Sequence, residues 1–594
     1  MELKLFDHGN QVLECESESL FGRRNLIKGI ALAGVARAGK LMASSVASSS
    51  GDASIVIRSP RVEQWGLQEI VLRSEKAYGN PFKDVQLQGV FSCGDVQVTA
   101  DGFYDGDLTW RIRLMPERQG NWSFKTKSND AALDGKAGTF EAIAPSKNNH
   151  GPVRVAKKFH FSYADGTPFY PLGTTTYGLF LGDHETQVRM MGTLAGSAFN
   201  KARINVMAFS SLAPGDSAFL RTSSSELDFD RYNVDFFRRY EAGLLDLQAL
   251  GIEADLILFH PYDSKGKFSK LPQEQDAGYI RHTAARLSAY RNVWWTLTNE
   301  FDLFPIFGVE KDWKRHGELL LASDPYGHLR GIHNSCCGFY DNSESWITHV
   351  ILQDITLQRL TADPRNNSAM GLDSRKFSKP VVIDEYGYEG NIARTWGSIA
   401  PRESVEMHWS IVMAGAYGSH GESYYGTPSG TFVGEAPERL AFLKKVMSET
   451  PFQDLEPNPD VLSGENASIT ILAAPGTCYL IHFAQPKEVA SWNLGFFGPA
   501  TPSHPLPIKP GSVDPNSFSG PVPKFTIQEG LYRVEMIDLW QMKIHQMGYT
   551  SGASQQFNSS IEPGVIRLTR VESLPPDEKA LPIAQLLGRN SRGR

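Results

Sequence analysis

Short strand-like runs alternate with longer helix-like segments between Pro168 and Val446. This pattern is typical of parallel strands that are joined by helices. We predict eight such strands, at residues 169–173, 202–207, 254–259, 293–298, 329–333, 347–352, 381–384 and 411–416. After the second strand, apolar residues recur at intervals of three and four, which predicts a helix with one apolar stripe. These residues are Phe237, Tyr240, Leu244 and Leu247. The region is therefore predicted to form a (β/α)8 barrel, with its active site at the carboxyl ends of the strands.

The chain on either side of this region has a different pattern. In residues 54–143, short alternating runs are separated by Gly, Asp and Asn turns, which is typical of a β-sandwich. Strand signals return after residue 450, and a proline-rich interval at 499–523 is predicted to be a surface loop. We therefore predict a multidomain chain of the α/β plus all-β class, in which two β-sandwiches flank a TIM barrel. The predicted domains are residues 54–143, 152–449 and 450–572, followed by a poorly ordered tail at 573–594.

The first 47 residues are predicted to be a targeting segment. Residues 22–28 read Gly-Arg-Arg-Asn-Leu-Ile-Lys and resemble a twin-arginine export signal, followed by a weakly apolar run. Arg37 and Lys40 interrupt that run, and Leu26 stands where such signals usually have a bulky aromatic residue. The expected location is periplasmic or extracellular, and the alternative is a cytoplasmic protein with an N-terminal extension.

Composition narrows the classes of partner. The chain has 594 residues, which is too long for one core, and a formal net charge of −7, which argues against a nucleic-acid surface and fits a neutral substrate. No other stretch approaches the roughly 18 apolar residues of a membrane span. The five cysteines are too few and too irregular for a disulfide framework or a zinc site, so we expect buried thiols and no metal or other cofactor. The oligomeric state is not specified by the sequence.

Two predicted barrel strands lead directly into a glutamate. The fourth strand lies in the segment Trp-Trp-Thr-Leu-Thr-Asn-Glu-Phe, which ends with Asn299, Glu300 and Phe301. The seventh lies in Pro-Val-Val-Ile-Asp-Glu-Tyr-Gly, which contains Glu385. Paired carboxylates at one end of a barrel are the groups that glycoside hydrolysis requires. The sequence therefore predicts an enzyme that cleaves a glycosidic bond in a carbohydrate substrate.

The chain resembles a known group of enzymes on these motifs. A fourth strand ending in Asn-Glu and a seventh ending in Glu resemble clan A of the retaining glycoside hydrolases. The phrases at residues 165–175 and 346–353 resemble the barrel of uncharacterised bacterial multidomain glycosidases and, more distantly, of apiosidase-type enzymes. Those at residues 79–82, 102–106 and 120–124 resemble the immunoglobulin-like domain that precedes such barrels. The resemblance covers residues 54–570.

The resemblance implies a role for four residues. Glu385 is expected to be the nucleophile and Glu300 the acid/base, with the charge on Glu385 raising the pKa of Glu300. Asn299 is expected to donate to the 2-hydroxyl of the sugar. Arg203 matches the arginine of the clan that hydrogen-bonds to the nucleophile and keeps it ionised.

Other residues follow the predicted strands and are candidates for substrate binding. His260, His333 and His420 are expected to bind sugar hydroxyls, with a structural role as the alternative. Tyr177, Trp396 and Tyr424 are candidates for stacking on a sugar, with packing as the alternative. Gln353 ends strand six, where many clan members have a different polar residue. Asp302, Asp384 and Glu389 are alternative carboxylates near the two glutamates.

The sequence therefore predicts a retaining glycoside hydrolase that acts by double displacement without a cofactor. We expect exo action on plant, algal or microbial oligosaccharides, because long loops follow several strands and would wall the site into a pocket. One alternative is a carbohydrate-binding protein whose barrel has lost activity. Another is a metal-dependent barrel hydrolase, suggested by the three histidines. The sugar, the anomer and the linkage are not specified by the sequence.

Overall fold

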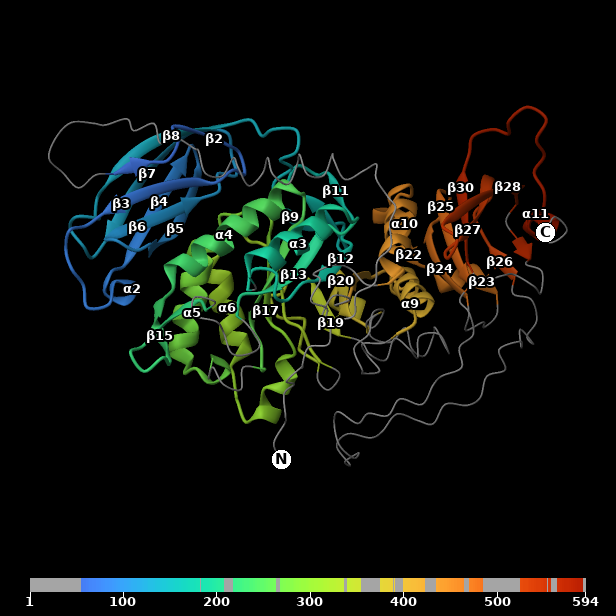
Figure 1. Cartoon of the computed structure of the whole chain (residues 1–594). Helices are drawn as coiled ribbons and strands as arrows, with labels where there is room; N and C mark the ends of the chain where they lie inside the picture. The colour runs from blue at the N-terminus through green and yellow to red at the C-terminus, as the bar shows by residue number, and fades with distance from the viewer. Residues whose placement is uncertain are drawn as a thin grey trace, which may run out of the picture. The chain divides into compact units, whose positions relative to one another are not determined.

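The computed structural model describes most of the chain after residue 54. The described residues are 55–181, 183–207, 217–262, 268–335, 339–353, 374–387, 389, 399–421, 434–463, 469–483, 524–552, 554–556 and 564–590. Along the chain they form an N-terminal β-domain, a parallel barrel with surrounding helices, and a C-terminal pair of β-sheets (Figure 1). The export-like segment, the proline-rich interval, Cys336 and Cys337 lie outside the described residues. Within the described part of the chain, no helix combines the length and the apolar character needed to cross a membrane.

The N-terminal β-domain is one sheet of eight strands in the order β1-β3-β6-β5-β4-β7-β8-β2. Its strands are β1 Val56–Ile57, β2 Arg61–Glu63, β3 Gln68–Arg73, β4 Leu87–Cys93, β5 Val96–Tyr104, β6 Thr109–Leu114, β7 Gly120–Ser128 and β8 Ala137–Ile143, and α2 spans Pro81–Asp84. Along β7, Trp122, Phe124 and Thr126 are buried and their neighbours are exposed. This alternation places one side of the strand on the core, as the sequence predicts.

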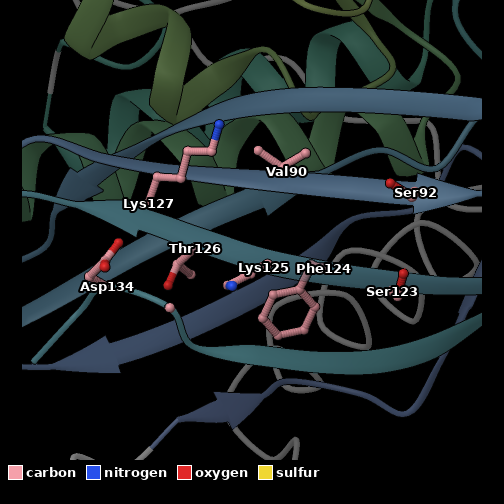
Figure 2. A pocket seen from close by; sticks show the side chains of 9 residues that line it. Val90, Ser92, Ser123, Phe124, Lys125, Thr126, Lys127 and Asp134 are labelled. Carbon is pink, nitrogen blue, oxygen red and sulfur yellow. The ribbon is translucent and has the colours of Figure 1, made fainter.

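A pocket of about 490 Å³ lies on this β-domain. Figure 2 shows the side chains that line it, which come mainly from β4 and β7 and include Lys125, Lys127 and Asp134. All of its lining residues belong to the N-terminal domain, so this pocket is separate from the predicted glutamate site.

A small antiparallel sheet precedes the barrel. It consists of β9 Val153–Ala156, β10 His160–Tyr163 and β11 Pro168–Phe169. Phe169 pairs with Phe161 in this sheet, so the prediction that the first barrel strand spans 169–173 is wrong at its start. Residues 170–172 belong to neither strand, and the barrel strand begins only at Gly173. The continuous apolar run from Phe169 to Leu172 gives no sign of this boundary in the sequence.

The barrel consists of eight parallel strands in the order β18-β17-β16-β13-β12-β21-β20-β19. They are β12 Gly173–Thr175, β13 Lys201–Asn205, β16 Glu253–Phe259, β17 Val293–Thr298, β18 Arg330–Gly331, β19 Val350–Gln353, β20 Val381–Glu385 and β21 Tyr417–His420. A parallel bridge between His333 and Ile351 joins the two ends of this order. The predicted TIM barrel is therefore confirmed.

The eighth predicted strand is wrong. Residues 411–416 are the end of helix α9, Pro401–Met413, and the turn that follows it. Gly415 has φ +71°, the left-handed conformation in which helices commonly end. The strand itself is β21, which begins two residues later at Tyr417. A short apolar run at the end of a buried helix has the same appearance in sequence as a buried strand.

In the part of the chain that the structure describes, helices surround the barrel, together with short helical turns and a hairpin. The α-helices are α3 His184–Ala195, α4 Val234–Ala249, α5 Gln273–Leu287, α6 Trp313–Ser323, α9 and α10 Ala436–Ser448, and the hairpin pairs β14 Phe219–Arg221 with β15 Leu227–Tyr232. The short turns of the barrel are η1 Phe268–Lys270, η2 Phe301–Leu303, η3 Pro305–Phe307 and η5 Arg375–Phe377; η7 Phe452–Asp454 and η8 Pro459–Val461 follow α10 in the chain.

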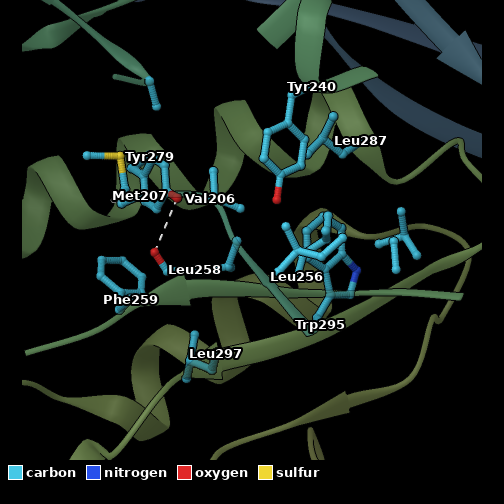
Figure 3. Packing of buried hydrophobic residues seen from close by; sticks show 14 of the residues in the cluster. Val206, Met207, Tyr240, Leu256, Leu258, Phe259, Tyr279, Leu287, Trp295 and Leu297 are labelled. Atoms are coloured by element: carbon cyan, nitrogen blue, oxygen red, sulfur yellow. Dashed lines mark hydrogen bonds between the residues drawn. The ribbon is translucent and has the colours of Figure 1, made fainter. Parts of the chain in front are cut away.

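The apolar stripe predicted after the second strand is confirmed in α4. Its residues Phe237, Tyr240, Leu244 and Leu247 are all buried. Figure 3 shows Tyr240 with Leu287 of α5 and the outward side chains Leu256 and Trp295 of the barrel in one apolar cluster. These outward residues alternate with inward ones, so the same strands also supply polar side chains to the barrel interior.

A buried network of charges connects the N-terminal domain to helices α4 and α5. Glu241 of α4 accepts from Arg113 Nη2 at 2.8 Å and from Arg286 Nε at 2.6 Å. Arg286 Nη2 also donates to Asp105 of the N-terminal domain at 2.9 Å. Both guanidinium groups lie over the ring of Phe103, with Arg113 Cζ 4.9 Å and Arg286 Cζ 4.4 Å from the ring centroid. The domain is therefore fixed to the barrel by paired charges that are removed from water.

Replacing Glu241 by alanine should destabilise the chain strongly. It would leave two buried guanidinium groups without this carboxylate, which typically costs about 3–5 kcal/mol. The matched control is Glu185→Ala, which breaks an exposed pair with Arg189 and should cost about 0.5 kcal/mol or less. Chemical denaturation of both variants measures the difference, and equal losses would contradict the importance of the buried network.

Two β-sheets follow the barrel in the chain. The larger has the order β22-β24-β25-β30-β27-β28, with β22 Glu456–Pro457, β24 Ile469–Ala474, β25 Cys478–Phe483, β27 Leu531–Asp538, β28 Lys543–Ser551 and β30 Gly564–Arg570. The smaller pairs β23 Leu462–Ser463 and β29 Ser554–Gln556 with β26 Lys524–Thr526. Helix α11, Ile583–Asn590, lies in the tail that was predicted to be poorly ordered, and it buries Ile583 and Leu586. For residues 583–590 that prediction is wrong, because Ile583 and Leu586 join the core of the C-terminal sheets.

Candidate active site

The carboxyl ends of β12, β13 and β20 bring three predicted site residues together. Arg203 of β13 donates from Nη1 to Glu385 Oε1 at 2.8 Å. Tyr177, two residues after β12, donates its hydroxyl to the same oxygen. The guanidinium of Arg203 also lies over the Tyr177 ring at 5.7 Å from its centroid. One carboxylate oxygen therefore receives a charged and a neutral donor from two neighbouring strands.

These contacts keep Glu385 ionised. Burial alone would raise its pKa, but the positive charge of Arg203 and the hydrogen bonds from Arg203 and Tyr177 outweigh that effect. The net result is a pKa below the ordinary value for a glutamate. A carboxylate that is charged, oriented and largely shielded from water is suited to attack an electrophilic carbon.

Glu300 has the opposite electrostatic environment. Burial and the negative charges of Glu385 and Asp302 raise its pKa well above the ordinary value, and a hydrogen bond from Gln353 and the charge of Arg203 reduce that rise only in part. The backbone of Glu300 is left-handed, with φ 45° and ψ 57°, which is uncommon for a residue with a side chain. Such conformations cluster at functional sites. Because its pKa is raised and that of Glu385 is lowered, Glu300 holds a proton under conditions in which Glu385 does not.

Arg203 organises the site across four strands. Its Nη2 donates to Asn299 Oδ1 at 2.8 Å, and its Nη1 also lies 3.3 Å from Thr175 Oγ1. Because Asn299 precedes Glu300, the guanidinium connects the segment of one glutamate to the carboxylate of the other. Binding the amide oxygen of Asn299 also leaves its Nδ2 as the group that can donate to a ligand.

A layer of buried charges supports the site from inside the barrel. Lys201 Nζ lies 2.7 Å from Asp255 Oδ2 and 2.8 Å from Asp384 Oδ1, and all three side chains are fully buried. Asp384 also accepts from the Ser419 hydroxyl, and its pKa falls to about 2 because Lys201 and Arg203 outweigh the effect of burial. Asp384, an alternative carboxylate in the sequence, is therefore an anchor between strands.

The two other alternative carboxylates, Asp302 and Glu389, accept hydrogen bonds from backbone N–H groups. Asp302 accepts from the Ser335 backbone N–H at 2.6 Å and from its hydroxyl at 2.7 Å. Glu389 accepts from the backbone N–H groups of Glu435 and Ala436, at 2.7 and 2.8 Å, at the start of α10. Asp302 orders the chain after β18, and Glu389 caps a helix.

Gln353 and His333 lie beside the glutamates. Gln353 is opposite Glu385 in the register of β19 and β20, and its side chain hydrogen-bonds to Glu300. His333 is fully buried and interacts electrostatically with Glu385. Burial lowers the pKa of His333 to about 4, so its ring is neutral near pH 7. Both residues were predicted to be in the site, and the structure brings both to it.

The remaining predicted residues have other surroundings. His260 Nε2 lies 3.1 Å from the Met207 carbonyl oxygen, and its Nδ1 accepts from the Tyr262 N–H at 3.3 Å, so its ring is fixed by the backbone. His420 stacks on Phe199, on the opposite side of β21 from the inward Ser419. Sugar binding by His420 stays a prediction. Trp396 and Tyr424 lie outside the described residues.

Sequence reasoning missed Lys201 and Asn205, although a signal was present. Both lie two residues from Arg203 on β13, and alternation places all three side chains on the same face of the strand. The residues between them, Ile204 and Ala202, belong to the apolar cluster on the helix side. A polar residue at every second position of a buried strand is the pattern that identifies the interior face.

Two buried carboxylates with opposite pKa shifts thus lie at the ends of the fourth and seventh strands of the (β/α)8 barrel. Residues 156–427 match the family model described as the apiosidase-like catalytic domain. Residues 61–129 match a domain of unknown function, DUF5060. No curated protein matches the chain.

Solved structures from Bacteroides vulgatus resemble the chain. One, described as a "putative glycoside hydrolase", is 29% identical, has a TM-score of 0.69 and covers 86% of this chain and 100% of its own. Another, described as a glycoside hydrolase of family 5, is 12% identical, has a TM-score of 0.53, covers 76% of this chain and 99% of its own, and shows the fold alone. The barrel and these matches place the chain in the class of glycoside hydrolases.

Proposed function

We propose that the chain is a retaining glycoside hydrolase in which Glu385 is the nucleophile and Glu300 is the acid/base. The observation that carries this proposal is the opposite shift of the two pKa values, lowered for Glu385 and raised well above the ordinary value for Glu300. A pair of carboxyl groups in different protonation states supplies a nucleophile and an acid at the same pH. A protein that only binds carbohydrate has no requirement for this difference.

In the first step, Glu385 attacks the anomeric carbon while Glu300 donates its proton to the departing oxygen. The glycosidic bond breaks, the leaving group departs as an alcohol, and the sugar becomes an ester of Glu385. Arg203 and Tyr177 hold the attacking carboxylate in position throughout. Asn299, whose amide oxygen is bound by Arg203, offers its N–H groups to the 2-hydroxyl.

In the second step, Glu300 is ionised and takes a proton from water, which attacks the same carbon and releases the sugar. Formation of the ester neutralises Glu385, and this removes the negative charge that raised the pKa of Glu300. The pKa of Glu300 therefore falls after the first step. Glu300 is then ionised more readily, as its role as base in the second step requires. Besides the substrate and water, the two steps use only side chains of the protein.

The substrate is proposed to be a carbohydrate of plant, algal or microbial origin, cleaved from a chain end. We further propose that the protein is exported, on the basis of the twin-arginine pattern in residues 22–28. The N-terminal domain is proposed to be immunoglobulin-like and the two C-terminal sheets to form a β-sandwich around Ile481, Phe525 and Tyr532, with the domains divided as the sequence predicts.

The stereochemistry of the product tests the mechanism. We expect proton NMR of an active aryl glycoside digest to show first the sugar anomer that has the configuration of the substrate. A panel of gluco-, galacto-, manno-, xylo- and arabinosides would identify that substrate. Initial release of the opposite anomer would contradict the assignment of Glu385 as nucleophile.

Replacing Tyr177 by phenylalanine should weaken catalysis and shift its pH dependence. The variant removes a hydrogen bond to a charged carboxylate, which is expected to lower kcat/KM by about 10- to 100-fold. Because this bond lowers the pKa of Glu385, its loss raises that pKa, and the acid limb of kcat/KM moves to higher pH. The matched control is Tyr78→Phe, which removes a 2.6 Å bond to Asp130 in the N-terminal domain. Its pH–rate profile should equal that of the wild type, and a similar profile for both variants would contradict the role of Tyr177.

A further inference from the structure

Asn205 ends strand β13 inside the barrel, and its side chain is only 1% exposed. Neither its amide oxygen nor its amide nitrogen has a hydrogen-bond partner among the residues that the structure describes. A buried amide without partners typically costs about 1–3 kcal/mol, so native proteins rarely retain one without a reason. The backbone of Asn205, in contrast, is fully engaged, because its N–H donates to the Tyr177 carbonyl at 3.1 Å and its carbonyl accepts from the Tyr240 hydroxyl at 3.2 Å.

The direction of the Asn205 side chain follows from its neighbours on the strand. Ile204 and Val206 belong to the apolar cluster between the barrel and its helices, where Figure 3 shows Val206. Arg203, two residues earlier, reaches Glu385 in the interior. Alternation therefore directs Asn205 into the barrel, about 6–7 Å closer than Arg203 to the end of the barrel that holds the glutamates.

Two other residues at this end of the barrel also have buried polar atoms without a hydrogen-bond partner in the described part of the chain. Both ring nitrogens of His333 and the amide oxygen of Gln353 lack a hydrogen-bond partner among the described residues. His333 interacts electrostatically with Glu385, and Gln353 donates toward Glu300. Asn205, His333 and Gln353 thus bring buried polar atoms without a hydrogen-bond partner among the described residues to the region of the two glutamates.

We propose that Asn205 is a substrate-binding residue whose amide engages two neighbouring hydroxyl groups of a neutral sugar, accepting from one at Oδ1 and donating to the other at Nδ2. An amide offers a donor and an acceptor side by side, and adjacent hydroxyl groups of a sugar offer the complementary pair. This inference rests on the proposed glycosidase function and adds a determinant of specificity to it. A site that hydrogen-bonds a hydroxyl discriminates strongly against a substrate that lacks it, because its buried groups are then left unpaired.

The test uses Asn205→Leu in the full-length chain and the aryl glycoside of the panel that the wild type hydrolyses fastest. The substitution keeps the size of the side chain and removes both polar atoms. We expect kcat/KM to fall about 100-fold and the melting temperature to remain equal or to rise, because an unpaired buried amide is replaced by an apolar group. The matched control is Asn292→Ala, which breaks bonds from Nδ2 to the Leu244 and Ile252 carbonyls, at 3.1 and 3.2 Å, away from the site. It should lower the melting temperature and leave kcat/KM within about twofold.

Monodeoxy analogues of the same glycoside identify the hydroxyl groups. Removal of each contacted hydroxyl should lower kcat/KM for the wild type by about tenfold or more and should have little further effect in Asn205→Leu. Equal losses in both proteins at every position, unchanged kcat/KM in Asn205→Leu, or a melting temperature lowered as in Asn292→Ala would each overturn the inference. Glu385→Ala separates the two proposals. If it is inactive while Asn205→Leu equals the wild type, only the role of Asn205 fails; if it is fully active, or the wild type hydrolyses no glycoside, the proposed function fails with it.

Discussion

Replacing Glu385 by alanine is expected to lower kcat/KM by about 10⁵-fold, because it removes the nucleophile itself. The loss should be similar for aryl glycosides with good and poor leaving groups, since neither reacts without the attacking carboxylate. Glu385 also neutralises the fully buried Arg203, so the alanine variant is expected to be less stable as well. Activity therefore has to be compared at a temperature at which both proteins are folded.

Glu385→Gln separates catalysis from folding. The amide keeps the volume of the side chain and can still accept from Arg203, but it lacks the negative charge needed for attack. It should be folded by circular dichroism and yet lose activity to a similar degree. Initial rates on the aryl glycoside measure the loss, and a Gln variant with more than about a hundredth of the wild-type kcat/KM would contradict the role of Glu385.

Replacing Glu300 by alanine should give a loss that depends on the leaving group. For an alkyl glycoside, which requires protonation of the departing oxygen, kcat/KM should fall by about 10²- to 10⁴-fold. For a dinitrophenyl glycoside, which departs without a proton, formation of the ester should be nearly unaffected and its hydrolysis should become slow. Added azide should then restore turnover, because it attacks the ester without needing a base. Equal losses on both substrates, with no response to azide, would contradict the role of Glu300.

The pH dependence of the wild type follows from the same assignment. Glu300 must be protonated in the first step, so kcat/KM should fall as the pH rises through its raised pKa. Glu385 must be ionised, so kcat/KM should fall as the pH drops through its lowered pKa. In Glu300→Ala, assayed with the dinitrophenyl glycoside, the basic limb should be absent and the acid limb should remain. This comparison assigns the basic limb to Glu300.

The sequence predicted the barrel well where a strand is buried on both sides and bounded by turns. The fourth strand, Val293–Thr298, has the predicted limits, and the seventh extends one residue further, to Glu385. The eighth was misplaced because Ile411 and its neighbours form a continuous apolar run, and the helix signals, Pro401 at the first turn and Gly415 after the last, were outweighed by that run.

The site was predictable to the extent that its residues end strands. Glu300, Glu385 and Asn299 could be placed at strand ends by counting strands, and Arg203 by the resemblance to clan A, but the hydrogen bond from Tyr177 to Glu385 could not be predicted. It depends on the close approach of β12 and β20 across a closed barrel, which no local pattern records. The alternation of Lys201, Arg203 and Asn205 was present in the sequence and marks the interior face of β13. The partners of Lys201, Asp255 and Asp384, lie on other strands and could not be identified from that pattern.

The most direct test of the central claim is to trap the ester. A 2-deoxy-2-fluoro glycoside with a dinitrophenyl leaving group, built on the sugar that the panel identifies, should inactivate the wild type. Fluorine slows both the formation and the hydrolysis of the ester, and the good leaving group speeds up its formation alone, so the ester accumulates. Peptide mass spectrometry should then locate one fluorosugar on Glu385. Labelling of any other residue, or continued turnover with no adduct, would contradict the assignment of Glu385 as the nucleophile of a retaining glycoside hydrolase.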